Sequence, residues 1–378
     1  MRTFLLLIFW GLWFLNFSSR TVFSPILPIL EQELHLTHAR AGSLFLFLSV
    51  GYTSTLLLAG SLAPRVGYKR TITAGFLAVT IAHLFLGQAR SYWSLASFFF
   101  LVGISTGIYM PSIIPIITAT FDRAKWGKVI ALHDTAASTS IFLIPILAAV
   151  CIRYFSWRAL FPVLSGACLA GALLFWSFSP DPRARDRAGS GFLHVFRRPV
   201  FWRMAVLWIF AAASNMGLYS IIPLFLVRER GIPIELANTV FGASRVGGIF
   251  VSILAGFMAD RYGARRILAL AFLITGASTI GVALAWNFPL LVGMLFLQAS
   301  VSLGFFPVAL LGISKLTTFE ERSAFTGGSL ALGVVFGLGV TPVLLGSAAD
   351  LWNFETGILA LGILTVISTL SLRGLKGI

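Results

Sequence analysis

Gly60-Ser-Leu-Ala-Pro-Arg-Val-Gly-Tyr-Lys-Arg70 and Gly256-Phe-Met-Ala-Asp-Arg-Tyr-Gly-Ala-Arg-Arg266 are two copies of one pattern, separated by 196 residues. Each copy ends a long apolar run, about a quarter of the way into its half of the chain. The same offset places Phe45 over Phe241 and Gly51 over Gly247. Because similarity at a fixed period is typical of duplicated folds, we interpret the chain as two related halves.

The composition excludes a water-soluble fold. Of the 378 residues, 58% are hydrophobic and 11% are charged, which leaves too few polar residues to cover a soluble particle of this size. The net charge of +15 would suggest nucleic acid as the partner of a soluble domain, so the positions of the basic residues matter more than their number.

Apolar runs predict twelve transmembrane helices, since about 20 apolar residues cross the hydrocarbon core of a bilayer. The predicted spans are 4–30, 41–63, 72–89, 93–118, 129–152, 159–178, 204–227, 237–259, 267–285, 289–315, 326–347 and 356–373. We therefore expect an all-α membrane protein with two pseudo-symmetric six-helix halves, residues 1–178 and 204–378. Residues 179–203 form the linker between them, and Pro180, Pro182, Gly189 and Gly191 predict that it contains no helix.

The basic residues predict the orientation. If the termini lie in the cytoplasm, 20 of the 28 lysines and arginines fall on the cytoplasmic side and six on the opposite side. This asymmetry follows the positive-inside rule, so the positive charge needs no nucleic acid to explain it. The two remaining basic residues, Arg20 and Arg245, lie within spans. Cys151 and Cys168 lie in or near apolar spans and predict packing residues instead of a disulfide or metal site.

The chain resembles the major facilitator superfamily over nearly its whole length. A Gly-x-x-x-Asp-Arg-x-Gly-x-Arg-Arg loop after the second and eighth helices marks that family, and Gly256 to Arg266 match it at every defined position. The first copy has Pro64 in place of the aspartate, and Trp157-Arg158 matches a second family mark at the sixth helix. The resemblance implies a secondary transporter with a central cavity, in a bacterial inner membrane.

By resemblance, the repeated loop acts as a cytoplasmic gate. The gate residues are Gly60, Arg65, Gly67, Gly256, Asp260, Arg261 and Gly263. Glycines permit close backbone approach, and an aspartate near a helix N-terminus is stabilised by the helix dipole. The alternative is that the basic residues only fix the topology, which we favour for Lys69, Arg70, Arg265 and Arg266. The missing acid at Pro64 predicts a weaker latch in the first half.

Arg20 and Arg245 are the main candidates for substrate binding. Each lies about 4.5 Å to the periplasmic side of the centre of its predicted span, at 1.5 Å per residue. Because the first and eighth helices line the cavity in the resembled family, we expect the two guanidinium groups to clamp an anion between the halves. The alternative is that either arginine pairs with Asp134 or with helix carbonyls and never meets a ligand.

Asp134 is the only acidic residue within a predicted span. It is predicted either to pair with an arginine or to carry a coupling proton together with His133. Adjacent helix residues point about 100° apart, so both cannot face the cavity equally, and a buried neutral histidine bonded to a backbone carbonyl is the favoured interpretation of His133. The uncharged residues predicted to complete the substrate pocket are Tyr52, Tyr109, Asn215, Tyr219 and Gln298.

The sequence thus predicts a symporter or antiporter of a small anion, such as a carboxylate or phosphate. We expect a monomer in the lipid bilayer, whose partners are the substrate and a coupling proton, with no cofactor, metal or catalytic residue. Two alternatives remain: an exporter of an apolar or cationic compound, and a transporter-like membrane receptor that binds without translocating.

Overall fold

The computed structural model describes residues 2–182 and 192–375, and every regular element in that part of the chain is a helix. This confirms the predicted all-α class. The first six spans are formed by α1 (Arg2–Thr21), α2 (Phe23–Glu33), α3 (His38–Val66), α4 (Tyr68–Leu86), α5 (Tyr92–Gly107), α6 (Tyr109–Thr120), α7 (Trp126–Tyr154) and α8 (Leu160–Phe178). The 3₁₀ turns η1 (Arg123–Lys125) and η2 (Trp157–Ala159) precede α7 and α8.

The second half repeats this arrangement with two π-helices added. Its helices are α9 (Phe192–Phe196), α10 (Pro199–Ala212), the π-helix η3 (Ala213–Gly217), α11 (Leu218–Arg228), α12 (Ile234–Ala243), α13 (Gly247–Tyr262), α14 (Ala264–Leu284), α15 (Phe288–Ser302), α16 (Phe305–Leu316), α17 (Phe319–Leu332), the π-helix η4 (Gly333–Val340), α18 (Thr341–Leu351), α19 (Phe354–Ser368) and the 3₁₀ helix η5 (Thr369–Gly374).

Helix starts confirm the sequence repeat. The pairs α3 and α12, α4 and α14, α5 and α15, and α6 and α16 each begin 196 residues apart. The loop glycines keep the same offset and the same conformation: Gly67 has φ 103° and Gly263 has φ 90°. Each forms a one-residue connection between two helices, in a region of φ that residues with a Cβ rarely adopt. The repeated motif therefore encodes the same sharp turn twice.

Ten helical segments among the described residues are long and apolar enough to cross a membrane. The predicted spans 72–89 and 237–259 fall outside this set and correspond to α4 and to the pair α12 and α13. The second of these is interrupted at Ser244–Val246, which leaves pieces of 10 and 16 residues. Neither piece alone has the roughly 20 residues that a membrane-spanning helix needs.

Prolines account for three other interruptions. A proline lacks an N–H donor, and its ring crowds the carbonyl four residues earlier in a helix. Pro25, Pro111 and Pro307 each follow a break by three or four residues. Val22 separates α1 from α2, Ile108 separates α5 from α6, and Leu303 and Gly304 separate α15 from α16. Pro111 and Pro307 lie 196 residues apart, so these two breaks also follow the repeat.

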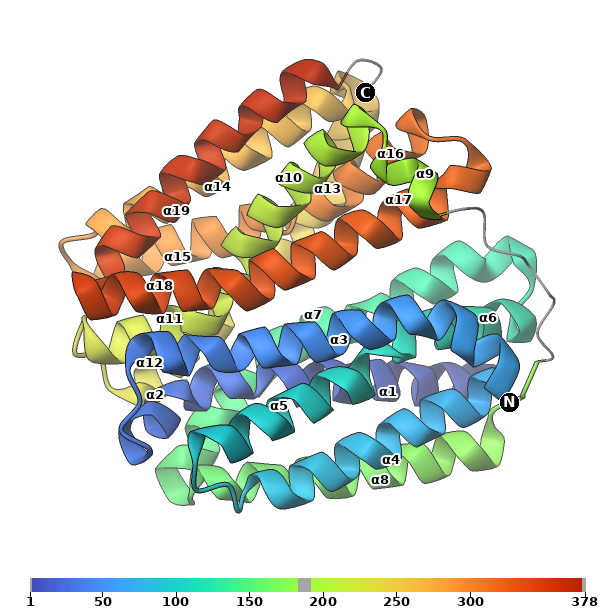
Figure 1. Ribbon diagram of the computed structural model, residues 1–378, viewed down its shortest axis with the longest axis horizontal. Coiled ribbons are helices and arrows are strands. Elements are labelled where there is room, and N and C mark those ends of the chain that lie inside the picture. The colour runs from blue at the N-terminus through green and yellow to red at the C-terminus, as the bar shows by residue number, and fades with distance from the viewer. Residues whose placement is uncertain (1, 183–191, 376–378) are drawn as a thin grey trace. The chain divides into compact units, whose positions relative to one another are not determined.

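By internal contacts the chain forms two units. The first includes the described residues of Met1–His35, Phe47–Arg187 and Ile234–Thr239, and the second those of Leu36–Leu46, Ala188–Pro233 and Val240–Ile378. In the first unit α1 packs on α7, and α4 lies beside α8 (Figure 1). In the second unit α14 packs along α19, while α10 contacts the π-helix η4 (Figure 1). The start of α3, in the first half of the chain, belongs to the second unit. The start of α12, in the second half, belongs to the first unit.

The linker between the halves contains helical residues, contrary to its prediction. Residues 179–203 were expected to contain no helix, but α9 lies within them and α10 begins at Pro199. Pro199 occupies the first turn of α10, where the missing N–H breaks no intrahelical hydrogen bond. The arginines at 183, 185 and 187 and the glycines at 189 and 191 lie outside the described residues. Asp181, which is described, accepts a hydrogen bond from the backbone N–H of Lys69 at 3.3 Å.

Candidate functional site

Arg245 lies at the interruption between α12 and α13. The backbone N–H groups of Arg245 and Val246 donate to the carbonyls of Gly242 and Ala243, three residues back, so the helix tightens at this point. The arginine is 5% exposed. A buried arginine at a break in a predicted span is unusual, because a charge that has left water requires compensating contacts.

The contacts of Arg245 are all with neutral groups. One terminal nitrogen donates to the carbonyl of Asn215 at 3.3 Å. The guanidinium carbon lies 4.5 Å from the ring centre of Tyr219 and 5.7 Å from that of Phe241. Its buried Nε has no hydrogen-bond partner among the described residues. The guanidinium group therefore retains a donor that no described residue uses.

The carbonyl that holds Arg245 belongs to a π-helix. Residues 213–217 form η3, in which the regular hydrogen-bond ladder is widened by one residue. Two of its carbonyls accept side-chain donors: Asn215 from Arg245, and Ser214 from the Gln298 amide at 2.7 Å. The Asn215 amide in turn donates to the Ser302 hydroxyl at 2.9 Å. The structure thus joins four of the predicted pocket residues, Asn215, Tyr219, Gln298 and Arg245, in one part of the second unit.

Arg20 has a similar environment in the first unit. It is the penultimate residue of α1, and it donates to the side-chain oxygen of Asn16 at 3.3 Å. The guanidinium carbon lies 4.3 Å from the ring centre of Phe17 and 4.6 Å from that of Tyr52. Asn16 is itself fixed, because its amide donates to the carbonyl of Thr106 at 3.0 Å. Arg20 is thus held against two rings at the break that precedes α2.

Neither arginine forms an ion pair with the described residues. The carboxylate partners within 4.0 Å belong to other basic residues, as in Arg158–Glu33 at 2.8 Å and Arg230–Glu355 at 2.9 Å. Asp134 forms no ion pair with Arg20, which lies in the same unit, among the described residues, so that predicted pair is absent. A pair between Asp134 and Arg245 stays a prediction, because the two residues belong to different units. Contact with helix carbonyls is present, although it satisfies only part of each guanidinium group. Aromatic faces stabilise a desolvated cation by about 2 kcal/mol without neutralising it.

Asp134 and His133 lie in different environments. Asp134 is exposed and accepts a hydrogen bond from Trp13 Nε1 at 3.2 Å. His133 is fully buried, and its Nε2 lies 3.1 Å from the hydroxyl of Tyr109. The interpretation that His133 bonds to a backbone carbonyl is therefore wrong. The carbonyl of Phe9 instead accepts from Tyr109, at 3.0 Å.

This pairing fixes the tautomer of His133. A tyrosine hydroxyl carries one hydrogen, and Tyr109 gives it to Phe9, so His133 Nε2 must be the donor to Tyr109. Nδ1 is then the acceptor, and it has no partner among the described residues. Trp13 stacks on both rings, with centroid distances of 5.2 Å to Tyr109 and 5.7 Å to His133. Tyr109 is consequently engaged inside the first unit.

The predicted gate residues lie at the turns Gly67 and Gly263. Gly60, Arg65, Asp260 and Arg261 are exposed, while Gly67, Gly256 and Gly263 are half-buried. Asp260 forms no ion pair with the residues that the structure describes. The first loop, which lacks an acid of its own at Pro64, has a carboxylate nearby from Asp181 of the linker.

Sequence reasoning predicted Tyr52 and Tyr219 but missed the phenylalanine partners of the arginines and the role of Ser302. Phe17 precedes Arg20 by three residues and Phe241 precedes Arg245 by four, so each lies one helical turn away on the same face. An aromatic residue one turn from an arginine within a span is a signal that would have identified both. Ser302 has no comparable signal, because its contact depends on how α15 packs against η3.

Comparisons with known proteins agree with this architecture. A family model described as Major Facilitator Superfamily matches residues 9–256 and 209–376. The membrane sensor protein UhpC of Escherichia coli (strain K12) is 22% identical, over 98% of this chain and 91% of its own length. A gallate transporter of Pseudomonas putida is 24% identical, over 85% of this chain and 82% of its own. A crystal structure of a bacterial homologue of the human lysosomal transporter Spinster has a TM-score of 0.86 and 17% identity, covering 98% of this chain and 97% of that one.

Proposed function

Because the chain belongs to the major facilitator superfamily of membrane transport proteins, we propose that it is a secondary active transporter of a small anion. Arg245 and Arg20 bind the substrate, which is a carboxylate or a phosphate-like group. The transporter exposes this site alternately to the two sides of the membrane. No chemical conversion of the substrate is involved.

The single observation that carries this proposal is the environment of Arg245. Arg245 is 5% exposed and has no carboxylate partner among the described residues, and its Nε is a donor that none of them uses. Such a group is suited to bind an anion that is not part of the chain. Carboxylates and phosphates accept two parallel N–H donors from such a group. The name of the Pseudomonas relative, a transporter of gallate, supports a carboxylate.

Coupling is assigned to Asp134. Asp134 is an exposed residue, and among the described residues its carboxylate accepts one hydrogen bond, from Trp13, so a proton can reach it without the loss of an ion pair. The transporter therefore moves the anion with protons or by exchange. The distribution of basic residues supports cytoplasmic termini, and we propose a monomer in the cytoplasmic membrane of a bacterium.

A second function is favoured by one relative. UhpC, which aligns over 98% of this chain, is named a membrane sensor protein. The same anion site then serves as a receptor that binds its ligand without translocating it. This alternative differs from the first only in the final step, so uptake and binding must be measured separately.

The test is reconstitution of the purified protein in proteoliposomes. Uptake and binding of labelled gallate and labelled phosphate are measured with and without an imposed pH gradient, for wild type and Arg245→Gln. Accumulation in wild type that Arg245→Gln abolishes supports the transporter. Binding without uptake supports the sensor. Equal binding in wild type and Arg245→Gln, or no binding of either anion, overturns the anion site.

A further inference from the structure

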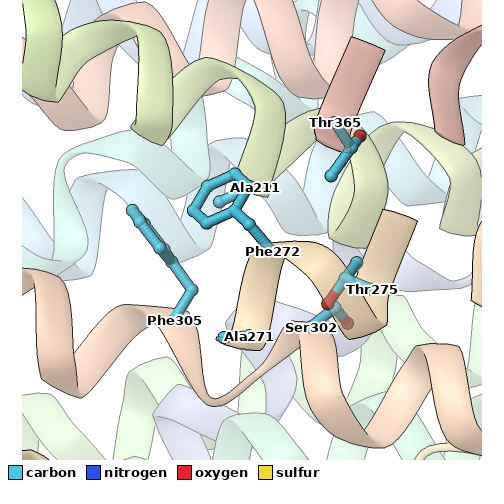
Figure 2. Close-up of a pocket in the computed structure, with 7 residues that line it drawn as sticks. All are labelled: Ala211, Ala271, Phe272, Thr275, Ser302, Phe305 and Thr365. Atoms are coloured by element: carbon cyan, nitrogen blue, oxygen red, sulfur yellow. The ribbon is translucent and has the colours of Figure 1, made fainter. Parts of the chain in front are cut away.

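A small cavity lies inside the second unit, lined by residues from five helices. Figure 2 shows the lining residues Ala211, Ala271, Phe272, Thr275, Ser302, Phe305 and Thr365. Three of the seven carry hydroxyl groups, although the rest of the lining is apolar. The Thr275 hydroxyl has no hydrogen-bond partner among the described residues.

Two of these hydroxyls connect the cavity to the π-helix η3. Thr365 Oγ1 lies 2.8 Å from Ser214 Oγ, and Ser302 Oγ accepts from the Asn215 amide at 2.9 Å. Ser214 and Asn215 are the residues whose carbonyls hold Gln298 and Arg245. A continuous set of hydrogen bonds therefore runs from the cavity wall through η3 to the guanidinium group.

From this geometry we infer that Ser302 and Thr365 are positioning residues that set the anion affinity of Arg245 by holding η3 in place. The inference rests on the proposed function, because it concerns the same anion site. Both residues act through η3: Thr365 through Ser214 and Ser302 through Asn215.

The packing of η3 explains why hydrogen bonds control its position. On one side it is closely packed: a Cβ added to Gly217 would collide with the carbonyl oxygen of Gly337 in η4 and would lie 2.7 Å from Thr341 Cβ. Toward α15 and α19, the hydroxyls of Ser302 and Thr365 form hydrogen bonds with the side chains of Asn215 and Ser214. Loss of either hydroxyl leaves a buried polar side chain of η3 without this partner, which favours a shift of η3.

Affinity measurements with matched variants test this inference. Thr365→Val keeps the shape of the side chain and removes its hydroxyl, Ser302→Ala removes the other, and Thr365→Ser retains one. We expect Thr365→Val and Ser302→Ala to raise the Kd for gallate or phosphate by about 5- to 20-fold, as the loss of one buried hydrogen bond predicts. Thr365→Ser should stay within about twofold of wild type, because its hydroxyl can still reach Ser214.

The control is Thr279→Val in α14. Thr279 is fully buried, and its hydroxyl bonds only to the carbonyl of Thr275 in its own helix. This variant loses a buried hydroxyl of the same kind without a link to η3, so its Kd should not change. Equal Kd increases in Thr279→Val and Thr365→Val would overturn the inference, since the effect would then be general destabilisation.

Hydrogen exchange provides a readout that needs no anion. Backbone amides of residues 213–219 should exchange at least about threefold faster in Thr365→Val and Ser302→Ala than in wild type, while those of α14 remain unchanged. If Thr365→Val and Ser302→Ala both keep the wild-type rate of amide hydrogen exchange and the wild-type Kd, the positioning role is overturned. If Arg245→Gln abolishes binding in that case, the proposed function stands and only this inference fails. If Arg245→Gln binds normally, the proposed function fails as well.

Discussion

At the scale of single residues, the site depends on arginine in particular. The Arg245 guanidinium group uses one nitrogen for the Asn215 carbonyl and faces two rings, and its Nε has no hydrogen-bond partner in the part of the chain that the structure describes. A planar group with five donors can hold a backbone carbonyl and an anion at the same time. A lysine ammonium is a point charge on a flexible stem and cannot reproduce this division of donors.

Arg245→Lys should therefore lower the initial rate of anion uptake by at least about tenfold, although the charge is conserved. The measurement is uptake by proteoliposomes with equal amounts of folded protein. Arg230→Lys is the matched control, because Arg230 is paired with Glu355 at 2.9 Å and should tolerate the change. Wild-type kinetics in Arg245→Lys would exclude a role that needs the planar group.

Asp134 tests the coupling mechanism. Asp134→Asn keeps an oxygen for Trp13 Nε1 but is permanently neutral, so it imitates the protonated state. We expect accumulation driven by a pH gradient to disappear while exchange of internal and external anion continues. Asp122→Asn, at an exposed acid paired with Arg2, should leave both activities intact. Normal gradient-driven accumulation in Asp134→Asn would show that the proton uses another group.

At the scale of elements, the sequence predicted the helices better than their interruptions. Apolar run length and the repeat predicted twelve spans, ten of which are helical segments long and apolar enough to cross a membrane, and prolines account for the breaks near Pro111 and Pro307, because these physical causes are local. The π-helices η3 and η4 have no such local signature. They arise where Gly217 and Gly337 bring two backbones together, which depends on packing between helices distant in sequence.

The same reason limits prediction of the site. Arg20 and Arg245 stand out in the sequence because charges within spans are rare. Their ring partners Tyr52 and Tyr219 come from neighbouring helices, and the bond from Ser302 to Asn215 joins α15 to η3. Contacts of this kind follow from tertiary packing, so the sequence could name uncharged pocket candidates by their chemistry but could not say which of them contact each arginine.

Helix α3 is capped by a residue far away in the chain. The carboxylate of Asp350, at the end of α18, accepts the backbone N–H groups of His38 at 2.8 Å and Ala39 at 2.9 Å. Because the first N–H groups of a helix have no intrahelical acceptor, this contact stabilises α3 and ties its first turn to α18. The crossing is close, since a Cβ added to Gly346 would collide with the carbonyl of His38.

Asp350→Ala should lower the thermal midpoint by about 1–2 °C, the shift that corresponds to losing a helix cap of about 1 kcal/mol in a chain of 378 residues. Glu235→Ala is the comparison, since Glu235 lies in the first turn of α12 and its carboxylate caps no helix among the described residues. Its midpoint should change less. Both are measured by thermal unfolding in detergent, and equal midpoints for wild type and Asp350→Ala would contradict the capping role.

At the scale of the whole molecule, the duplication is close in backbone and unequal in chemistry. Helix starts and the turns at Gly67 and Gly263 repeat at the same offset. The first loop has Pro64 inside α3 where the second has Asp260, and the carboxylate near the first turn comes from Asp181 of the linker. The two loops therefore depend on different acids, and only the second carries its acid within the motif.

This inequality leads to a prediction about the conformational equilibrium. If Asp260 latches the cytoplasmic side of the outward-facing state, Asp260→Asn removes one charge-assisted contact of about 1–3 kcal/mol and shifts the protein toward the inward-facing state. A cysteine at the exposed position Thr135, in a background without Cys151 and Cys168, reports the change. Its labelling by an impermeant maleimide from the cytoplasmic side should become at least about fivefold faster, because a change of about 1 kcal/mol alters the ratio of the two states by that factor.

Variants of the first loop complete the test. Asp181→Asn should accelerate labelling less than Asp260→Asn, because its contact with the N–H of Lys69 lies within one unit and does not depend on the conformational state. Pro64→Asp restores the acid at the position that matches Asp260 and should slow labelling below the wild-type rate. Equal rates in wild type and Asp260→Asn would mean that the repeated loop fixes the topology and the turn but does not latch the transporter, since loss of a state-dependent contact must change the population of the two states.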